Sequence, residues 1–231
     1  MSRLGIIGDT HLPFVHPMYL RFIQDTFEQY GVTKVHHIGD VVDGHAISFW
    51  DHDPDGHSAG READLAAEAL EEWKETFPSI TVNIGNHDER QFRVARKAGL
   101  PSRYINDYKK VWGTPKWKWD FSHQIDGNYL THGTGTSGKD AAFNLACQKR
   151  MSTIIGHVHA YAGVKWHSNP FNAIFGMNVG CGVDPRSYAF SYGRDIPVRP
   201  ILGCGIVIDG WMPIFIPMRC GEGEKYNRRR A

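Results

Sequence analysis

The sequence predicts an α/β fold, and three observations support this prediction. Short apolar runs rich in β-branched residues are typical of buried strands, and they cover residues 4–8, 35–39, 80–85 and 153–156. Each run ends in glycine followed directly by Asp, Asn or His. Segments with helical spacing of apolar residues lie between the runs. Alternating strands and helices indicate a sheet that gathers ligands at the carboxyl ends of its strands.

Four helices are expected between these strands. The first has Pro17 in its first turn and ends at Gly31, with an apolar face between them. The other three are expected over residues 61–77, after Glu89 and over residues 140–149.

The last third of the chain has a different pattern. Residues 173–179, 201–208 and 211–216 are strand-like, and Asp209-Gly210 is a strong signal for a two-residue hairpin. These strands predict a second sheet packed on the first.

The composition bounds the domain organisation and the partners. With 231 residues, 41% of them hydrophobic, the chain can form one domain over residues 1–218, followed by a mobile basic tail over residues 219–231. Lys and Arg total 26 against 25 Asp and Glu, so the net charge of +1 excludes a polybasic binder of nucleic acid or membranes. No apolar run approaches the roughly 18 residues of a membrane span, and no signal-peptide core is present. A cytoplasmic protein is expected.

The cysteines and histidines have different distributions. The four cysteines are widely spaced and lack Cys-x-x-Cys pairs, so reduced packing residues are expected at Cys147, Cys181, Cys204 and Cys220. The 13 histidines are the unusual feature of the composition, and several of them follow the expected strands.

Residues that can bind metals stand directly after the expected strands, each with a neighbouring glycine. The five motifs are Gly8-Asp9-Thr10-His11, Gly39-Asp40, Gly85-Asn86-His87-Asp88, Thr131-His132-Gly133 and Gly156-His157-Val158-His159. Glycine allows a tight turn or a close approach of the backbone. Carboxylate, amide and imidazole groups together suit divalent transition metals. One such motif would fit an ordinary core or turn residue, but five at strand ends favour a shared metal site.

The order of these motifs resembles that of the calcineurin-like metallophosphoesterases. The family pattern of Asp-x-His, Gly-Asp, Gly-Asn-His-Asp/Glu, a separate His and Gly-His-x-His is complete between residues 8 and 159. The resemblance implies a four-layer αββα sandwich of two mixed sheets with a dinuclear metal centre at the strand ends. It also implies the ligands: Asp9, His11 and His159 for the first ion, Asn86, His132 and His157 for the second, and Asp40 as the bridge.

The resemblance further implies hydrolysis of a phosphoester by a hydroxide that bridges two divalent ions. Two ions stabilise both the attacking and the departing oxygen of an in-line displacement, and they lower the pKa of bound water. Manganese is the expected metal, and iron, zinc and nickel are alternatives that accept the same ligands.

Four further residues are candidates for catalysis or substrate binding. The resemblance places His87 against the phosphate, where an imidazolium would stabilise charge or protonate the leaving oxygen. Asp88 would orient His87 and keep its pKa high, and the alternative is a carboxylate at a helix N-terminus. His45 and Arg90 are candidates for substrate contacts, although Arg90 also fits a solvent-exposed helix position. Gly44-His45 stand where the protein Ser/Thr phosphatase branch carries Arg-Gly, which argues against that branch because neither residue clamps phosphate as Arg does.

Two segments have alternative interpretations. Residues 45–57 are rich in His and Asp, and they either line the substrate mouth or form a solvated connector. Residues 109–119 interleave Lys and Trp, which fits either a single-strand nucleic-acid surface or a half-buried strand with its lysines outward.

The expected function is that of a divalent-metal-dependent phosphodiesterase or nuclease acting on nucleic acid or nucleotides, as the Lys and Trp segment suggests. A phosphomonoesterase of broad range is the alternative. A catalytically inactive interaction scaffold is the third, and the complete ligand set argues against it. The expected partner is a phosphoester substrate, without a membrane, and the sequence does not define the oligomeric state.

Overall fold

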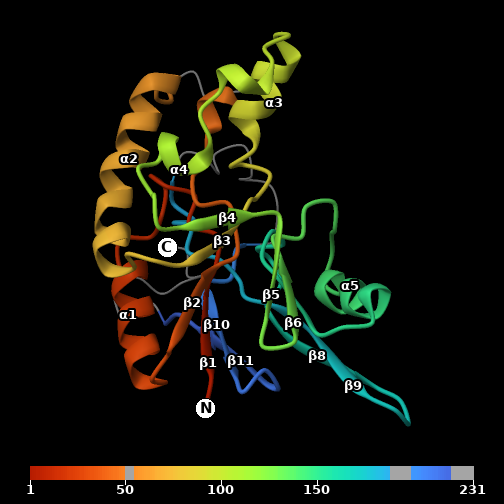
Figure 1. The fold of residues 1–231 in the computed structure, drawn as a ribbon. Helices are drawn as coiled ribbons and strands as arrows, with labels where there is room; N and C mark the ends of the chain where they lie inside the picture. Colours follow the sequence, from red (N-terminus) through yellow and green to blue (C-terminus); the bar gives the residue numbers. More distant parts are fainter. Residues whose placement is uncertain (50–54, 188–198, 220–231) are drawn as a thin grey trace.

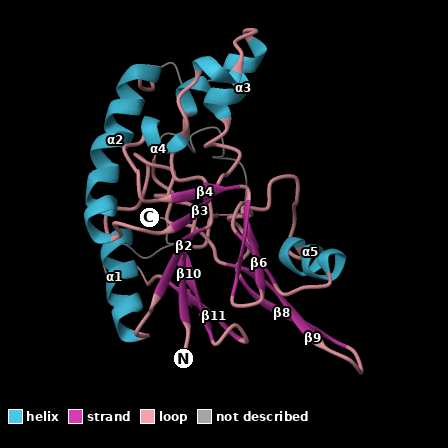
Figure 2. Cartoon of the chain, viewed as in Figure 1, coloured by secondary structure: helices cyan, strands magenta, loops and turns pink. Residues whose placement is uncertain are grey.

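The computed structural model describes residues 1–49, 55–187 and 199–219, which form two facing β-sheets with helices outside them (Figure 1, Figure 2). The strands are β1 (Arg3–Ile7), β2 (Lys34–His37), β3 (Thr81–Asn83), β4 (Lys118–Asp120), β5 (Ser122–Ile125), β6 (Asn128–Thr131), β7 (Thr153–Ile155), β8 (Gly163–Ser168), β9 (Ala173–Asn178), β10 (Gly203–Ile208) and β11 (Met212–Pro217). The first sheet has the order β11-β10-β1-β2-β3-β4, and the second has the order β5-β6-β7-β9-β8.

Both sheets are mixed, as expected. Strands β1 to β4 pair in parallel, whereas β10 is antiparallel to both β1 and β11. In the second sheet β6, β7 and β9 are parallel, and β5 and β8 add antiparallel edges. The predicted α/β sandwich of two mixed sheets is thus confirmed.

The four expected helices are present, and three of them form the outer layers of the sandwich. The helices are α1 (Tyr19–Gln29), α2 (Ala59–Thr76), α3 (Arg90–Lys97), α4 (Tyr108–Val111) and α5 (Ala141–Lys149), with short 3-10 turns at His45–Ile47 and Ser102–Tyr104. Helices α1 and α2 lie on the outer side of the first sheet, and α5 lies on the outer side of the second (Figure 1). Helix α3 projects beyond the sandwich.

Two apolar layers hold these elements together. Between the sheets, Ile6 of β1 belongs to the same buried cluster as Leu130 of β6 and Met177 of β9. Under the helices, Ile23 of α1 and Trp73 of α2 belong to a second cluster. Full burial of such side chains contributes about 1.5 to 3 kcal/mol each, so the sandwich rests on both layers.

The last third of the chain does not form a sheet of its own, contrary to the expectation. Of the three strands expected there, β9 joins the second sheet, whereas β10 and β11 extend the first because β10 pairs along the whole of β1. The predicted hairpin between β10 and β11 is confirmed, with Asp209 at φ 50° and Gly210 at φ 71°, the left-handed pair that a tight hairpin needs.

The Lys and Trp segment is structural. Lys118–Asp120 forms edge strand β4, Trp117 is 1% exposed, and Lys116 and Lys118 face solvent. The half-buried-strand interpretation is therefore confirmed for this part, and the buried Trp117 is not available for stacking on bases.

Some expectations fall partly outside the described residues. Residues 50–54 of the His and Asp segment lie outside them, as do Cys220 and residues 220–231 of the predicted tail, so the domain boundary at 218 stays a prediction. Cys147, Cys181 and Cys204 are free thiols. Among the described helices, none combines the length and the apolar character needed to cross a bilayer.

Candidate metal centre

The two sheets bring the five motifs to one place. Asp9, Asp40 and Asn86 follow β1, β2 and β3 of the first sheet, and His132 and His157 follow β6 and β7 of the second. Three groups of ligand atoms, each with all members within 4.8 Å of one another, form where these ends meet: Asp9, His11 and His159; His11, Asp40 and His87; and Asp40, His132 and His157.

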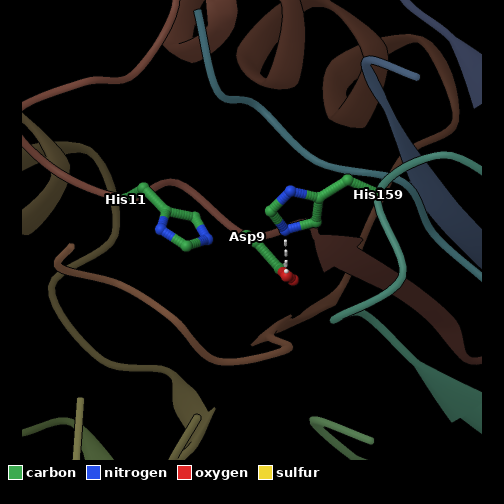
Figure 3. A group of neighbouring side chains, drawn as sticks. All are labelled: Asp9, His11 and His159. Carbon is green, nitrogen blue, oxygen red and sulfur yellow. Dashed lines mark hydrogen bonds and ion pairs between the residues drawn. The ribbon is translucent and has the colours of Figure 1, made fainter. Parts of the chain in front are cut away.

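Asp9 organises the first group (Figure 3). Its Oδ2 lies 2.8 Å from His159 Nε2 and accepts a 2.8 Å hydrogen bond from the backbone N–H of His157. His11 presents its ring to the same space, and its centroid is 5.1 Å from that of His159.

Asp40 lies between the first group and the third, which contains His132 and His157. Its Oδ2 is 3.1 Å from His132 Nε2 and 3.5 Å from His11 Nε2. Its Oδ1 accepts a 2.8 Å hydrogen bond from the backbone N–H of His87. Asn86 adds an amide oxygen 3.1 Å from His132 Nε2. One carboxylate oxygen thus faces ligand atoms of both groups.

The ligand atoms of the centre suit cations, because two of these atoms are buried and lack hydrogen-bond partners among the described residues. Asp9 Oδ1 and His11 Nε2 are buried and have no hydrogen-bond partner among the described residues, an arrangement that costs free energy unless another group satisfies them. The other ring nitrogen of His11 lies 2.7 Å from Asp43 Oδ1, and that of His132 donates to the carbonyl of Ile38 at 3.2 Å. Metal-ligating histidines are oriented in this way, with one nitrogen anchored and the other directed to the ion.

The backbone at the centre is strained and tightly approached. His11, Asp40 and His157 have positive φ angles of 48°, 49° and 64°, and such non-glycine conformations cluster at functional sites. A Cβ on Gly85 would collide with Asp40 Oδ1, and one on Gly156 would collide with Asp9 Oδ1. Glycine is required there because the carboxylates occupy that space.

The buried carboxylates and imidazoles of the centre shift one another's pKa values. Burial alone would raise the pKa of Asp40, but His132 and His87 outweigh it and hold that pKa well below its usual range. Burial alone would lower the pKa of His132, but Asp40 and Asp9 raise it to about 9. Burial and the neighbouring His132 lower the pKa of His157 to about 4. Cation binding here would displace a proton from His132.

Asp88 does not have the role expected of it. Its Oδ1 accepts from the backbone N–H groups of Val41 and Val42, and its Oδ2 accepts from that of Gly85. The side chain is buried, and burial together with Asp40 raises its pKa to about 7. Asp88 therefore fixes the loops after β2 and β3, and none of these hydrogen bonds goes to the His87 ring, which corrects the orienting interpretation. The helix-terminal interpretation and a catalytic role of Asp88 stay predictions.

Asp43 takes the role expected of Asp88. Its Oδ1 lies 3.0 Å from His87 Nδ1, and its backbone carbonyl lies 2.9 Å from the same nitrogen. In the sequence, the only signal for Asp43 was its position three residues after Asp40. A second unexpected contributor is Glu62 of α2, which accepts from the backbone N–H groups of His45 and Ala46 and so holds the turn after Asp43.

The two candidates for substrate contacts lie in different environments. The Arg90 side chain is 12% exposed, donates to the Asp43 carbonyl at 2.8 Å and places Nη2 3.1 Å from His87 Nε2. The solvent-exposed interpretation of Arg90 is therefore wrong. His45 is buried, and its role in substrate binding stays a prediction.

Comparisons with known proteins identify the family. A family model described as calcineurin-like phosphoesterase matches residues 2–174, so the chain belongs to the calcineurin-like phosphoesterase family, as its motifs predicted. No curated protein matches the sequence. Among solved structures, the chain is similar to Yfce, a phosphoesterase from E. coli, at 16% identity and a TM-score of 0.45, covering 90% of this chain and 88% of that one. A metallophosphoesterase from Sphaerobacter thermophilus is similar at 16% identity and a TM-score of 0.46, covering 89% of this chain and 82% of that one. Vacuolar Protein Sorting 29 from Cryptosporidium parvum is similar at 13% identity and a TM-score of 0.46, covering 89% and 83% respectively.

Proposed function

We propose that this chain is a hydrolase of phosphoesters that uses two divalent ions. The observation that carries the proposal is the position of Asp40 Oδ2, which faces His132 of one ligand group and His11 of the other. One ion would be held by Asp9, His11, His159 and Asp40, and the other by Asp40, Asn86, His132 and His157. Manganese is the proposed metal, with iron, zinc and nickel as alternatives suited to the same donors.

When bound, the ions would lower the pKa of a coordinated water and neutralise charge on the phosphate. His87 would act from the substrate side, because its ring centroid lies 4.3 Å from that of His11 and its side chain is 18% exposed. Burial alone would lower the pKa of His87, but Asp40 and Asp43 raise it, which favours the imidazolium. That cation would stabilise charge or protonate the leaving oxygen. Arg90, 3.1 Å from His87, would bind the same phosphate.

We propose further that the substrate is a phosphodiester in nucleic acid or nucleotides. Arg90 stands at the start of α3, and the exposed cations Arg93 and Lys97 follow it on the same helix. In a phosphomonoester no further phosphate follows the one at the metal centre, so cations beyond the centre would not increase its affinity. A nucleic-acid strand would continue over them.

The test combines metal analysis with two nitrophenyl esters. Protein reconstituted with Mn²⁺ is expected to hold about two ions per chain and to hydrolyse bis-p-nitrophenyl phosphate faster than p-nitrophenyl phosphate. Asp40→Asn is the matched variant, and it should lose both metal and activity because the bridging charge is removed. Faster cleavage of the monoester would support a phosphomonoesterase instead. Full metal content with neither ester cleaved would overturn the hydrolase and support an interaction scaffold.

A further inference from the structure

One projection of this nearly neutral chain is strongly basic. Residues 90–111, here called the basic arm, carry seven cations and a single carboxylate, Asp107. Removing these from the 26 cations and 25 acids of the whole chain leaves a net charge of −5 elsewhere. The arm comprises α3, the turn at Ser102–Tyr104 and α4, and Figure 1 shows α3 standing clear of the sandwich. The seven cations are Arg90, Arg93, Arg96, Lys97, Arg103, Lys109 and Lys110.

These cations are displayed to solvent and are not used for packing. Helix α3 contains no buried residue. All of the cations except Arg90 are exposed, and no carboxylate in the described part of the chain forms an ion pair with any of those six. Like charges without counter-charges repel one another, which raises the electrostatic free energy of the arm. Binding of a polyanion would lower this free energy.

An aromatic stack holds the arm in place. Phe92 of α3 lies 4.9 Å from Tyr108 of α4 between ring centroids, and Tyr108 stacks at 5.2 Å on Trp119 of β4. The stack ties the arm to the edge of the first sheet. Helix α3 is therefore presented as a fixed surface, although an isolated eight-residue helix would be marginal.

The cations of α3 lead away from the metal centre. Positions 90, 93 and 97 share one helix face, and the first of them reaches His87. The distance along the helix from Arg90 to Lys97 is about 10 Å, or about three phosphates along one strand of a duplex. Phe49 lies on this face, 47% exposed, with Arg93 and Lys97 each 5.1 Å from its ring centroid. An exposed ring with two cations beside it combines the aromatic surface and the charge that single-strand binders use.

We propose that the basic arm binds single-stranded nucleic acid and guides the strand so that one of its phosphodiesters reaches the metal centre. Arg93 and Lys97 neutralise backbone phosphates, and Phe49 stacks on a base. The inference rests on the proposed phosphodiesterase function for its catalytic part, whereas strand binding by the arm is measured separately.

The first test measures binding without cleavage. Fluorescence anisotropy of a labelled oligo-dT strand of about 20 nucleotides, longer than a single binding site, is recorded with chelator present at several salt concentrations. Arg93→Gln/Lys97→Gln should weaken binding about tenfold and reduce the slope of log affinity against log salt by about 1.4. Phe49→Ala should weaken binding with little change in slope. The matched control, Lys149→Gln/Arg150→Gln at the far end of α5, should bind as the unaltered protein does.

The second test separates the arm from the chemistry. In the Mn²⁺-loaded enzyme, Arg93→Gln/Lys97→Gln should raise KM for the oligonucleotide about tenfold with little change in kcat, whereas the control Lys149→Gln/Arg150→Gln should change neither constant. The binding proposal is overturned if the arm and control variants lose the same affinity, or if a duplex of the same sequence binds as tightly as the single strand. Strand binding by the arm without hydrolysis of any ester would instead overturn the proposed function alone.

Discussion

The buried carboxylate of Asp43 contacts two histidines of the centre, His11 and His87. A change at Asp43 should therefore alter both metal binding and turnover. Its Oδ1 lies 2.7 Å from His11 Nδ1 and 3.0 Å from His87 Nδ1. Burial alone would raise the pKa of Asp43, but its hydrogen bonds with His11 and His87 lower it, so the carboxylate stays ionised. The contact fixes the ring of His11 with Nε2 directed to the centre.

We expect Asp43→Ala to weaken metal binding about 10- to 100-fold, as loss of such a supporting carboxylate typically does. Asp43→Asn should lose less, because its amide oxygen still accepts from His11. Isothermal titration with Mn²⁺ measures both. Asp25→Ala, an exposed carboxylate on α1, is the control. Equal affinity in Asp43→Ala and the unaltered protein would contradict the positioning role.

His87 is the histidine of the centre that we expect to act on the substrate and not to hold an ion. We expect His87→Ala to retain both ions, because the remaining donors are sufficient, and to lose most turnover of bis-p-nitrophenyl phosphate. Metal content and kcat are measured on the same preparation. His167→Ala, an exposed histidine on β8, should keep both. Normal turnover with unchanged metal content would remove His87 from the mechanism.

At the scale of elements, a polar group lies within the sandwich where β2 meets β3. His36 of β2 lies 2.8 Å from Thr81 Oγ1 and 2.7 Å from Asn83 Oδ1, and its ring centroid is 5.3 Å from that of His123 on β5. Burial, reinforced by His123 and His37, outweighs the bond to Asn83 and lowers the pKa of His36 to about 3. The histidine is therefore neutral in the folded protein and hydrogen-bonds to two side chains of β3.

This arrangement predicts a loss of stability in acid. In the unfolded chain His36 titrates near its ordinary pKa of about 6.5. Below that pH the unfolded state binds a proton that the folded state excludes, so the free energy of unfolding falls. Between pH 7 and pH 5 the loss from His36 is about 2 kcal/mol. Urea unfolding at both pH values should show a smaller loss in His36→Gln than in the control His167→Gln, and equal losses in the two variants would contradict the prediction.

Polar strands were not predicted from the sequence, and neither was the pairing of strands that lie far apart along the chain. Strands β5 and β6 have few apolar residues, yet Asp126-Gly127 between them carries the same hairpin signal as Asp209-Gly210, with φ angles of 50° and 79°. That dipeptide would have revealed them. No local pattern shows that β10 pairs with β1 across about two hundred residues, so its sheet could not be assigned from sequence.

In the metal centre, too, some residues could be identified from the sequence and the roles of others could not. Asp9, Asp40 and His132 could be identified because each follows a strand beside a glycine, and strand ends meet at one edge of a sheet. The roles of Asp43 and Asp88 could not, because both are carboxylates near the same motifs. Only the direction of each side chain, toward His87 or toward the backbone of Val41 and Gly85, separates them.

At the scale of the whole molecule, the centre joins the two sheets. The first sheet supplies Asp9 and Asp40, and the second supplies His132 and His159, so a bound ion would link the two halves of the sandwich. On the side of the first sheet, Asp9 Oδ1 and His11 Nε2 have no hydrogen-bond partner in the described part of the chain, and a bound ion would satisfy them. Metal binding and stability of the fold should therefore be coupled.

The coupling predicts a large rise in melting temperature on metal loading. At Mn²⁺ concentrations about 100 times Kd, binding adds about 2.7 kcal/mol per site, and each kcal/mol raises Tm of a chain of this size by about 2 to 4 °C. Calorimetry should show the rise for the unaltered protein, and chelator should reverse it. Asp40→Asn should lose most of the rise while Asp25→Asn keeps it, because only the former removes the carboxylate between the two ligand groups. A rise in Asp40→Asn equal to that of the unaltered protein would place the stabilising ion elsewhere and contradict the coupling.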